Sequence, residues 1–240
     1  MEEISGDYQL RAIQSGHPAQ RFWHSAKMRL IARLNIVGEN KTVIDIGCGS
    51  GVVSNFLSTS CQRVVGIDAN PAATTFAHRE FAKENLTFLN LKIEELDQVE
   101  EFDLLLCFEV LEHLHKANVH RAMSKFLEIA KPDAKLVITV PNNRSPWPLI
   151  ERLLDFFKMV PTLKDEQHLS TFNKHELTSG LERSGWKVEK IGTFNGISPF
   201  ASVISIKLGY FLEKVEFWLG SYIPNNLIYC VAHKDEPPLT

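Results

Sequence analysis

The stretch that decides the fold is Asp45-Ile46-Gly47-Cys48-Gly49-Ser50-Gly51, which overlaps the end of the apolar run Thr42–Ile46. Glycines at alternate positions permit a tight turn from a strand into a helix, and they leave bare backbone that a ligand can approach. A second apolar run, Val64-Val65-Gly66-Ile67-Asp68, ends on an acid that can accept hydrogen bonds from both hydroxyls of a ribose. The third glycine comes one residue earlier than in the G-x-G-x-x-G pattern, which disfavours NAD as the ligand.

Short β-branched runs alternate with longer helical patterns on both sides of this loop, which indicates a parallel sheet with helices on its faces. The expected strands are Thr42–Ile46, Arg63–Ile67, Leu86–Leu91, Phe102–Cys107, Leu136–Val140, Trp186–Thr193 and Leu227–Ala232. The expected helices cover residues 52–60, 71–84, 117–130, 147–158 and 174–184. Because no internal repeat or low-complexity linker divides the sequence, we expect one domain over residues 1–240.

The composition is that of an ordinary globular protein, with 240 residues, 44% of them hydrophobic and 23% charged. A formal net charge of −3 argues against a protein that binds the nucleic-acid backbone, so no DNA partner is expected. The four cysteines form no C-x-x-C pair, and the first residues lack the pattern of a signal peptide. We therefore expect a cytoplasmic protein without a disulfide framework.

Four motifs resemble those of class I S-adenosylmethionine-dependent methyltransferases. They are Asp45-x-Gly47-x-Gly49-x-Gly51, Gly66-Ile67-Asp68, Phe102-Asp103-Leu104-Leu105 and Lys131-Pro132. Residues 107–114, Cys-Phe-Glu-Val-Leu-Glu-His-Leu, are most similar to the branch that contains the ubiquinone-biosynthesis O-methyltransferases. The resemblance implies an α/β, Rossmann-like sheet of seven mostly parallel strands, with helices on both faces and an antiparallel last strand.

The resemblance also implies which residues contact the cofactor S-adenosyl-L-methionine. Residues 41–141 would form the cofactor-binding core, after a helical preface over residues 1–40. Gly47, Cys48 and Gly49 would face the methionine part and Asp68 the ribose, while Ile93 would pack on the adenine and Phe108 would line the cofactor from the other side. The complete set of implied contacts is Arg29, Asp45, Gly47, Cys48, Gly49, Gly51, Asp68, Ala69, Ile93 and Phe108.

A second group of residues suits a divalent metal. Glu109, Glu112 and His113 stand at positions i, i+3 and i+4, so a helical turn would place them on one face. Two carboxylates and an imidazole suit Mg²⁺, Mn²⁺, Fe²⁺ or Zn²⁺. The same arrangement occurs in metal-using members of the ubiquinone branch and in small-RNA 2′-O-methyltransferases, where a later histidine completes the site; here that residue would be His168. The alternative is that Glu112 and His113 simply begin a helix.

The metal would hold the acceptor hydroxyl as a Lewis acid. Without a metal, His113 or His168 is the candidate general base, because an imidazole titrates near neutral pH.

Two further segments, residues 142–173 and 195–226, are expected on the acceptor side of the sheet, where loops carry binding and chemistry. The second contains an apolar helix that suits a lid over an apolar acceptor, peripheral contact with a bilayer, or packing on the core or in a homodimer.

The sequence therefore predicts O-methylation of a small-molecule, aromatic, quinone or lipid-linked acceptor. RNA 2′-O-methylation, which the acidic charge balance opposes, and a non-catalytic cofactor-binding regulatory module are the alternatives.

Overall fold

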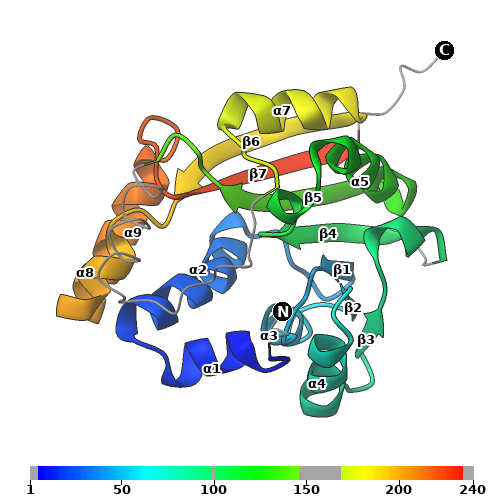
Figure 1. Ribbon diagram of the computed structural model, residues 1–240, viewed down its shortest axis with the longest axis horizontal. Helices are drawn as coiled ribbons and strands as arrows, with labels where there is room; N and C mark the ends of the chain where they lie inside the picture. Colours follow the sequence, from blue (N-terminus) through cyan, green and yellow to red (C-terminus); the bar gives the residue numbers. More distant parts are fainter. Residues whose placement is uncertain (1–4, 99–100, 146–168, 235–240) are drawn as a thin grey trace.

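The computed structural model describes residues 5–98, 101–145 and 169–234, and its centre is a sheet of seven strands (Figure 1). The strands are β1 (Thr42–Ile46), β2 (Arg63–Asp68), β3 (Leu86–Asn90), β4 (Phe102–Phe108), β5 (Ala130–Pro141), β6 (Trp186–Phe194) and β7 (Leu227–Lys234). They lie in the order β3-β2-β1-β4-β5-β7-β6, and only β7 runs antiparallel to its two neighbours. The predicted fold class is thereby confirmed.

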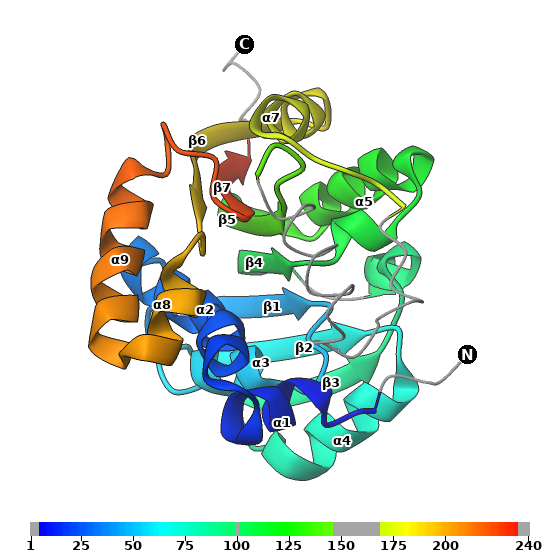
Figure 2. The same ribbon diagram turned by 60° about the vertical axis from the view of Figure 1, so that its left-hand side comes forward.

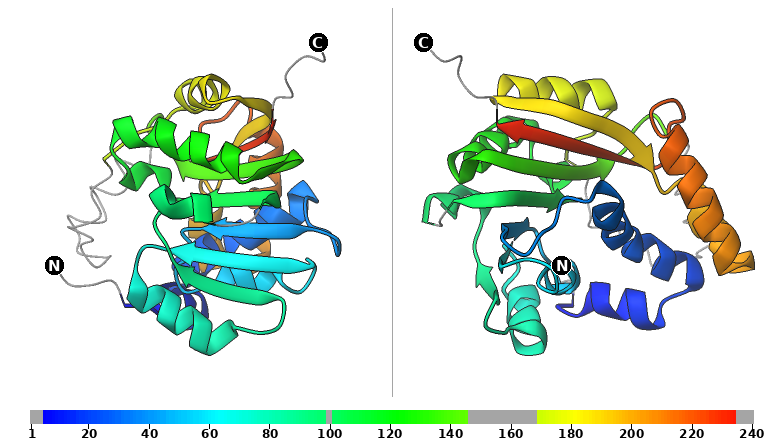
Figure 3. Two further views of the ribbon diagram at one scale, coloured as in Figure 1. Left: turned by 90° about the vertical axis from the view of Figure 1, so that its right-hand side faces the viewer. Right: turned by 180° about the vertical axis from the view of Figure 1, so that it is seen from behind.

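Helices pack on both faces of this sheet. They are α1 (Tyr8–Ser15), α2 (Pro18–Leu34), α3 (Val52–Leu57), α4 (Pro71–Phe81), α5 (Lys116–Glu128), α7 (Lys174–Arg183), α8 (Ser198–Ile204) and α9 (Ile206–Leu219), with the 3₁₀ turns η1 (Ile93–Gln98) and η2 (Leu111–His113). Figure 3 shows α5 and α7 on one face and α2 with α9 on the other. Buried Phe126 and Leu177 join the first face to the core, and Ile31 and Leu57 join the second.

The strand bounds follow the apolar runs closely, and the largest difference is at β5. This strand begins at Ala130, before the predicted Leu136, so the Lys131-Pro132 motif lies inside it. The register between β4 and β5 shifts near Phe102, and Lys131 Nζ lies 2.9 Å from Asp103 Oδ2 on the neighbouring strand. These contacts extend β5 beyond its apolar stretch.

The segment 195–226 contains two helices where the sequence predicted one. Ser205 has extended backbone angles (φ −156°, ψ 128°), and these end α8 and start α9. Figure 2 shows both helices along one flank of the molecule, beside α2. The predicted helix over 147–158 lies outside the described residues.

The parallel strands place several loops at one edge of the sheet. The loops after β1, β2 and β4 all leave the carboxyl ends of adjacent strands, because β2, β1 and β4 are neighbours in the sheet. In open α/β sheets this edge is where ligands bind. The fold therefore brings the glycine loop, Asp68 and Glu109 to one place.

Candidate functional site

The glycine loop adopts the backbone that its sequence predicts. Gly47, Gly49 and Gly51 have φ angles of 74°, 51° and 78°, a region that favours glycine. The N–H groups of Gly47 and Cys48 both donate to the Ile67 carbonyl, at 2.8 and 2.9 Å, which fixes the loop to the end of β2. The loop is therefore rigidly held at the sheet edge.

Two side chains approach the loop closely. A Cβ atom added at Gly47 would collide with the Val110 side chain, and one at Gly49 would lie 2.9 Å from the Gln9 carboxamide. Gln9 belongs to α1, and its backbone N–H donates to Ser50 Oγ at 3.1 Å. The first helix thus covers the glycine loop, a contact that no pattern in the sequence indicated.

Asp68 lies beside the loop, as predicted. Its Oδ2 accepts a hydrogen bond from the Gly49 N–H at 2.8 Å, and its Oδ1 accepts one from the Asn70 N–H at 2.8 Å. A carboxylate oxygen has a second acceptor position, so both oxygens retain capacity for the hydroxyls of a ribose. The geometry of Asp68 and the loop therefore fits a nucleoside.

The other implied cofactor contacts lie around the same edge. Ala69 is exposed next to Asp68, and Ile93 begins η1, half-buried against the core. Phe108 ends β4 and packs in the cluster that contains Cys48. Burial raises the pKa of the Cys48 thiol well above its usual value, so this side chain is an uncharged packing group.

Asp45 lies below the loop and is 2% exposed. Burial raises the pKa of its carboxyl to about 6, against the opposing effects of the Ser54 hydroxyl, which donates to it at 2.6 Å, and of the Lys27 ammonium. The side chain thus supports the loop from the protein interior.

Lys27 from α2 reaches the carboxyl end of β4. Its Nζ lies 3.0 Å from Glu109 Oε2, and its side chain is 9% exposed. Glu109 has a φ of 56°, and its other oxygen, Oε1, is buried and has no hydrogen-bond partner.

Nearby, burial and the Lys27 charge lower the pKa of His24 to about 4, so its imidazole is neutral at pH 7. Sequence reasoning missed Lys27, although its position four residues before buried Ile31 indicates a buried helix face.

Arg29, a further implied cofactor contact, pairs with a carboxylate of α9. Its Nε donates to both carboxylate oxygens of Glu213 in α9, at 2.8 and 2.9 Å, and its two terminal nitrogens donate to Ser25 Oγ and the Phe22 carbonyl. The Arg29 guanidinium thus joins α2 to α9, and the cofactor contact that the resemblance implies for it stays a prediction.

The predicted metal cluster does not assemble among the described residues, where no three His, Cys, Asp or Glu side chains converge. Glu109 is paired with Lys27, Glu112 is 2% exposed, and His113 is exposed on the 3₁₀ turn η2. The turn is not α-helical, so the expected i, i+3, i+4 face does not form. The three described members of the predicted metal site therefore do not gather in this structure. His168 lies outside the described residues.

Several buried polar atoms lie at the same edge of the sheet, beyond Glu109. Thr139 Oγ1, both amide atoms of Asn195 and Asn226 Oδ1 have no hydrogen-bond partner. Thr139 is near the end of β5, Asn195 follows β6, and Asn226 precedes the antiparallel β7. Sequence reasoning did not single out these residues, because their burial depends on how β5, β6 and β7 pair.

Comparisons with known proteins agree with this geometry. A family model described as "Methyltransferase domain" matches residues 16–191. Ubiquinone biosynthesis O-methyltransferase of Rhodopseudomonas palustris (strain TIE-1) is 32% identical over 109 residues, which cover 44% of this chain. The match spans 42% of that relative, less than half of its length.

Two solved structures share the fold. A SAM-dependent methyltransferase from Archaeoglobus fulgidus has a TM-score of 0.63 at 22% identity, covering 87% of this chain and 93% of its own. The N-methyltransferase NodS from Bradyrhizobium japonicum WM9, solved with S-adenosyl-L-homocysteine, has a TM-score of 0.60 at 14% identity, covering 98% and 100%.

Proposed function

The chain belongs to the methyltransferase-domain family, and from this premise we propose that it methylates an oxygen atom of a small aromatic, quinone-like or lipid-linked acceptor. Its general class is that of the class I S-adenosylmethionine-dependent methyltransferases. The choice of oxygen is supported by the similarity to a ubiquinone biosynthesis O-methyltransferase and by the surroundings of Glu109.

The cofactor site consists of the glycine loop and Asp68. When bound, S-adenosylmethionine supplies a methyl group that is already activated on a sulfonium sulfur. The loop offers backbone that approaches the ligand closely, and Asp68 offers acceptors for the ribose hydroxyls. The protein's main contribution is then to hold and align the reactants.

Glu109 is the observation that carries the proposal for oxygen. A hydroxyl must lose its proton when it is methylated, so a base is needed at the acceptor. Glu109 Oε1 is buried and without a hydrogen-bond partner at the edge where the glycine loop lies, while Oε2 is held by Lys27 at 3.0 Å. In this proposal Oε1 accepts the hydroxyl proton and Lys27 fixes the carboxylate. His113 and His168 stay sequence-based predictions for the same role.

A matched acceptor panel tests the proposal. The full chain is incubated with methyl-labelled S-adenosylmethionine and, separately, a catechol, a catechol bearing a prenyl chain, the corresponding anilines, and transfer RNA. We expect label on the catechol oxygens, and we expect Glu109→Gln to lower kcat about a hundredfold without weakening the binding of S-adenosylhomocysteine. Glu94→Gln, an exposed glutamate, is the control and should leave kcat unchanged.

Other patterns of labelling contradict the proposal. Label on the anilines alone assigns N-methylation, label on RNA alone assigns the RNA alternative, and cofactor binding with no acceptor labelled favours a regulatory module. The same assay, repeated with a chelator, tests whether a divalent metal takes part in the reaction. Because Glu109 is paired with Lys27, we expect kcat to stay within about twofold, a smaller change than removal of a catalytic metal would cause.

A further inference from the structure

The surface formed by residues 197–223, here called the α8–α9 surface, is unusually apolar. Of the thirteen large apolar side chains that are exposed within the described ranges, ten lie on it. The most exposed are Tyr222 (86%), Ile204 (83%), Trp218 (78%), Ile197 (62%) and Phe211 (62%). A contiguous exposed apolar surface indicates an interaction site, whereas apolar residues scattered singly do not.

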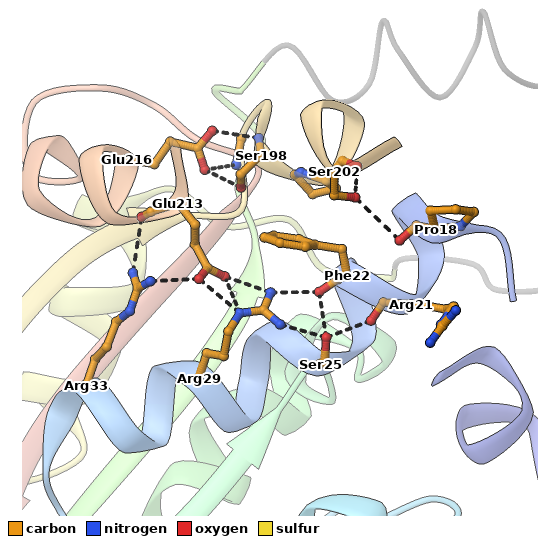
Figure 4. A network of polar contacts seen from close by, with 12 residues as sticks. Pro18, Arg21, Phe22, Ser25, Arg29, Arg33, Ser198, Ser202, Glu213 and Glu216 are labelled. Carbon is orange, nitrogen blue, oxygen red and sulfur yellow. Dashed lines mark hydrogen bonds and ion pairs between the residues drawn. The ribbon is translucent and has the colours of Figure 1, made fainter. Parts of the chain in front are cut away.

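The first acid of α9 is turned into the protein. Glu213 is 2% exposed, and it is ion-paired with Arg29 at 2.8 Å and Arg33 at 2.7 Å, both from α2 (Figure 4). The Arg29 guanidinium also lies 4.1 Å from the centre of the Phe22 ring. The negative charge of Glu213 is therefore neutralised inside the molecule.

The second acid of α9 is also internal. Glu216 is 7% exposed, and its carboxylate accepts hydrogen bonds from the N–H groups of Gly196, Ile197 and Ser198 at 2.6–3.0 Å and from Ser198 Oγ at 2.6 Å. Figure 4 shows it directed at the start of α8. Both acids of the segment thus face the protein.

The charge left on the outside is positive. Residues 197–223 contain two acids, both buried, and two lysines, Lys207 and Lys214, both exposed. The polarity of α9 is therefore the reverse of that expected for a helix on a water-facing surface, whose charged groups point outward. An apolar face with basic and aromatic residues is typical of helices that lie in the plane of a membrane interface.

We propose that the α8–α9 surface binds the face of a phospholipid bilayer that carries anionic headgroups. Phe211 and Ile204 enter the boundary of the acyl chains, Trp218 and Tyr222 lie at the headgroup level, and the two lysines contact phosphate groups. The contact is lateral, because α9 has 14 residues and a membrane span needs about 20. None of the helices in the described ranges is both long and apolar enough to cross a bilayer.

The charge of the α8–α9 surface favours an anionic bilayer over a second copy of the chain as its binding partner. If two copies met through this surface, residues 197–223 of each would offer the other's Lys207 and Lys214 no exposed carboxylate to pair with, because Glu213 and Glu216 are buried. Anionic headgroups supply that missing charge. The inference does not depend on methyl transfer, since binding is measured without acceptor or cofactor.

Flotation with lipid vesicles tests the proposal on the full chain. The vesicles are phosphatidylcholine alone and phosphatidylcholine with phosphatidylglycerol. We expect binding to the anionic vesicles, at least a tenfold loss of affinity in the double variant Phe211→Ser with Trp218→Ser, and a loss of the preference for phosphatidylglycerol in Lys207→Glu with Lys214→Glu. Two controls lie outside the surface: Leu89→Ser, an exposed apolar residue of β3, and Lys83→Glu.

Tryptophan fluorescence reports vesicle binding by the wild-type chain directly, without comparison with a variant that binds more weakly. The sequence has four tryptophans, and among those in the described ranges Trp218 is exposed, Trp23 is half-buried and Trp186 is buried in the core. We expect a shift of emission to shorter wavelength on addition of anionic vesicles, and quenching by brominated acyl chains. We expect Trp218→Phe to lose the part of both changes that comes from Trp218 and still to float with the vesicles, because phenylalanine keeps the apolar contact.

Three results would overturn the inference. The first is no binding to either vesicle by a chain whose circular dichroism is that of a folded protein. The second is binding that the surface variants leave unchanged. The third is a dimer in light scattering that Phe211→Ser with Trp218→Ser converts to a monomer while no vesicle is bound, which would assign the surface to a second copy.

Discussion

At the scale of single residues, Asp45 shows how the site depends on burial. Its pKa is raised from 3.8 to about 6 because the carboxyl is enclosed, although Ser54 and Lys27 oppose the shift. Between these two values the folded protein binds a proton that the unfolded chain has released. The contribution of Asp45 to stability is therefore greatest below about pH 4 and is lost as the pH rises through about 6.

We expect Asp45→Asn to remove this loss, since the amide keeps an oxygen that accepts from Ser54 and carries no charge to bury. The free energy of unfolding is measured with urea from about pH 4 to pH 7 for both proteins. The difference, variant minus wild type, should increase by on the order of 2–3 kcal/mol across that range. Asp133→Asn, at an exposed position, is the control. Parallel curves for Asp45→Asn and the wild type would show that the carboxyl is not desolvated.

At the scale of elements, α2 is the piece that joins the site to the α8–α9 surface. Lys27 points from it to Glu109, and Arg29 and Arg33 point to Glu213. The resemblance to the ubiquinone branch predicts that Arg29 contacts the cofactor, and in the structure its guanidinium pairs with Glu213 of α9. The two placements lead to different results when Arg29 is replaced.

We expect Arg29→Met to lower the free energy of unfolding by about 2 kcal/mol, because buried Glu213 loses one of its two cationic partners. The affinity for S-adenosylhomocysteine should stay within about twofold of the wild type, a difference of about 0.4 kcal/mol or less. Arg21→Met, an exposed arginine of the same helix, should change neither quantity. A tenfold loss of affinity in a stable Arg29→Met protein would restore the sequence-based placement.

Strands were easier to predict than the contacts between elements. The apolar runs at Thr42–Ile46 and Phe102–Cys107 are buried on both faces of the sheet, so their composition alone marks them. The position of α1 over Gly49 and the pairing of Lys27 with Glu109 depend on how helices that are distant in sequence pack. Local sequence patterns do not specify this packing.

At the scale of the whole molecule, the site follows from topology. The strand order puts β1 between β2 and β4, so the glycine loop, Asp68 and Glu109 meet although they are distant in sequence. The sequence predicted this because a glycine loop and an acid at successive strand ends form one site in a parallel sheet. It could not predict that Glu109 would pair with Lys27, or that no three metal-ligating side chains would converge within the described ranges.

The central claim is that the glycine loop and Asp68 hold the nucleoside of S-adenosylmethionine. Calorimetric titration of S-adenosylhomocysteine into the wild type, Asp68→Ala, Asp68→Asn and the exposed control Asp133→Ala tests it most directly. We expect saturable binding to the wild type and to Asp133→Ala, a rise in Tm on binding, at least a hundredfold weaker binding to Asp68→Ala, and an intermediate loss for Asp68→Asn. Binding to folded Asp68→Ala within a factor of two of the wild type would contradict the account.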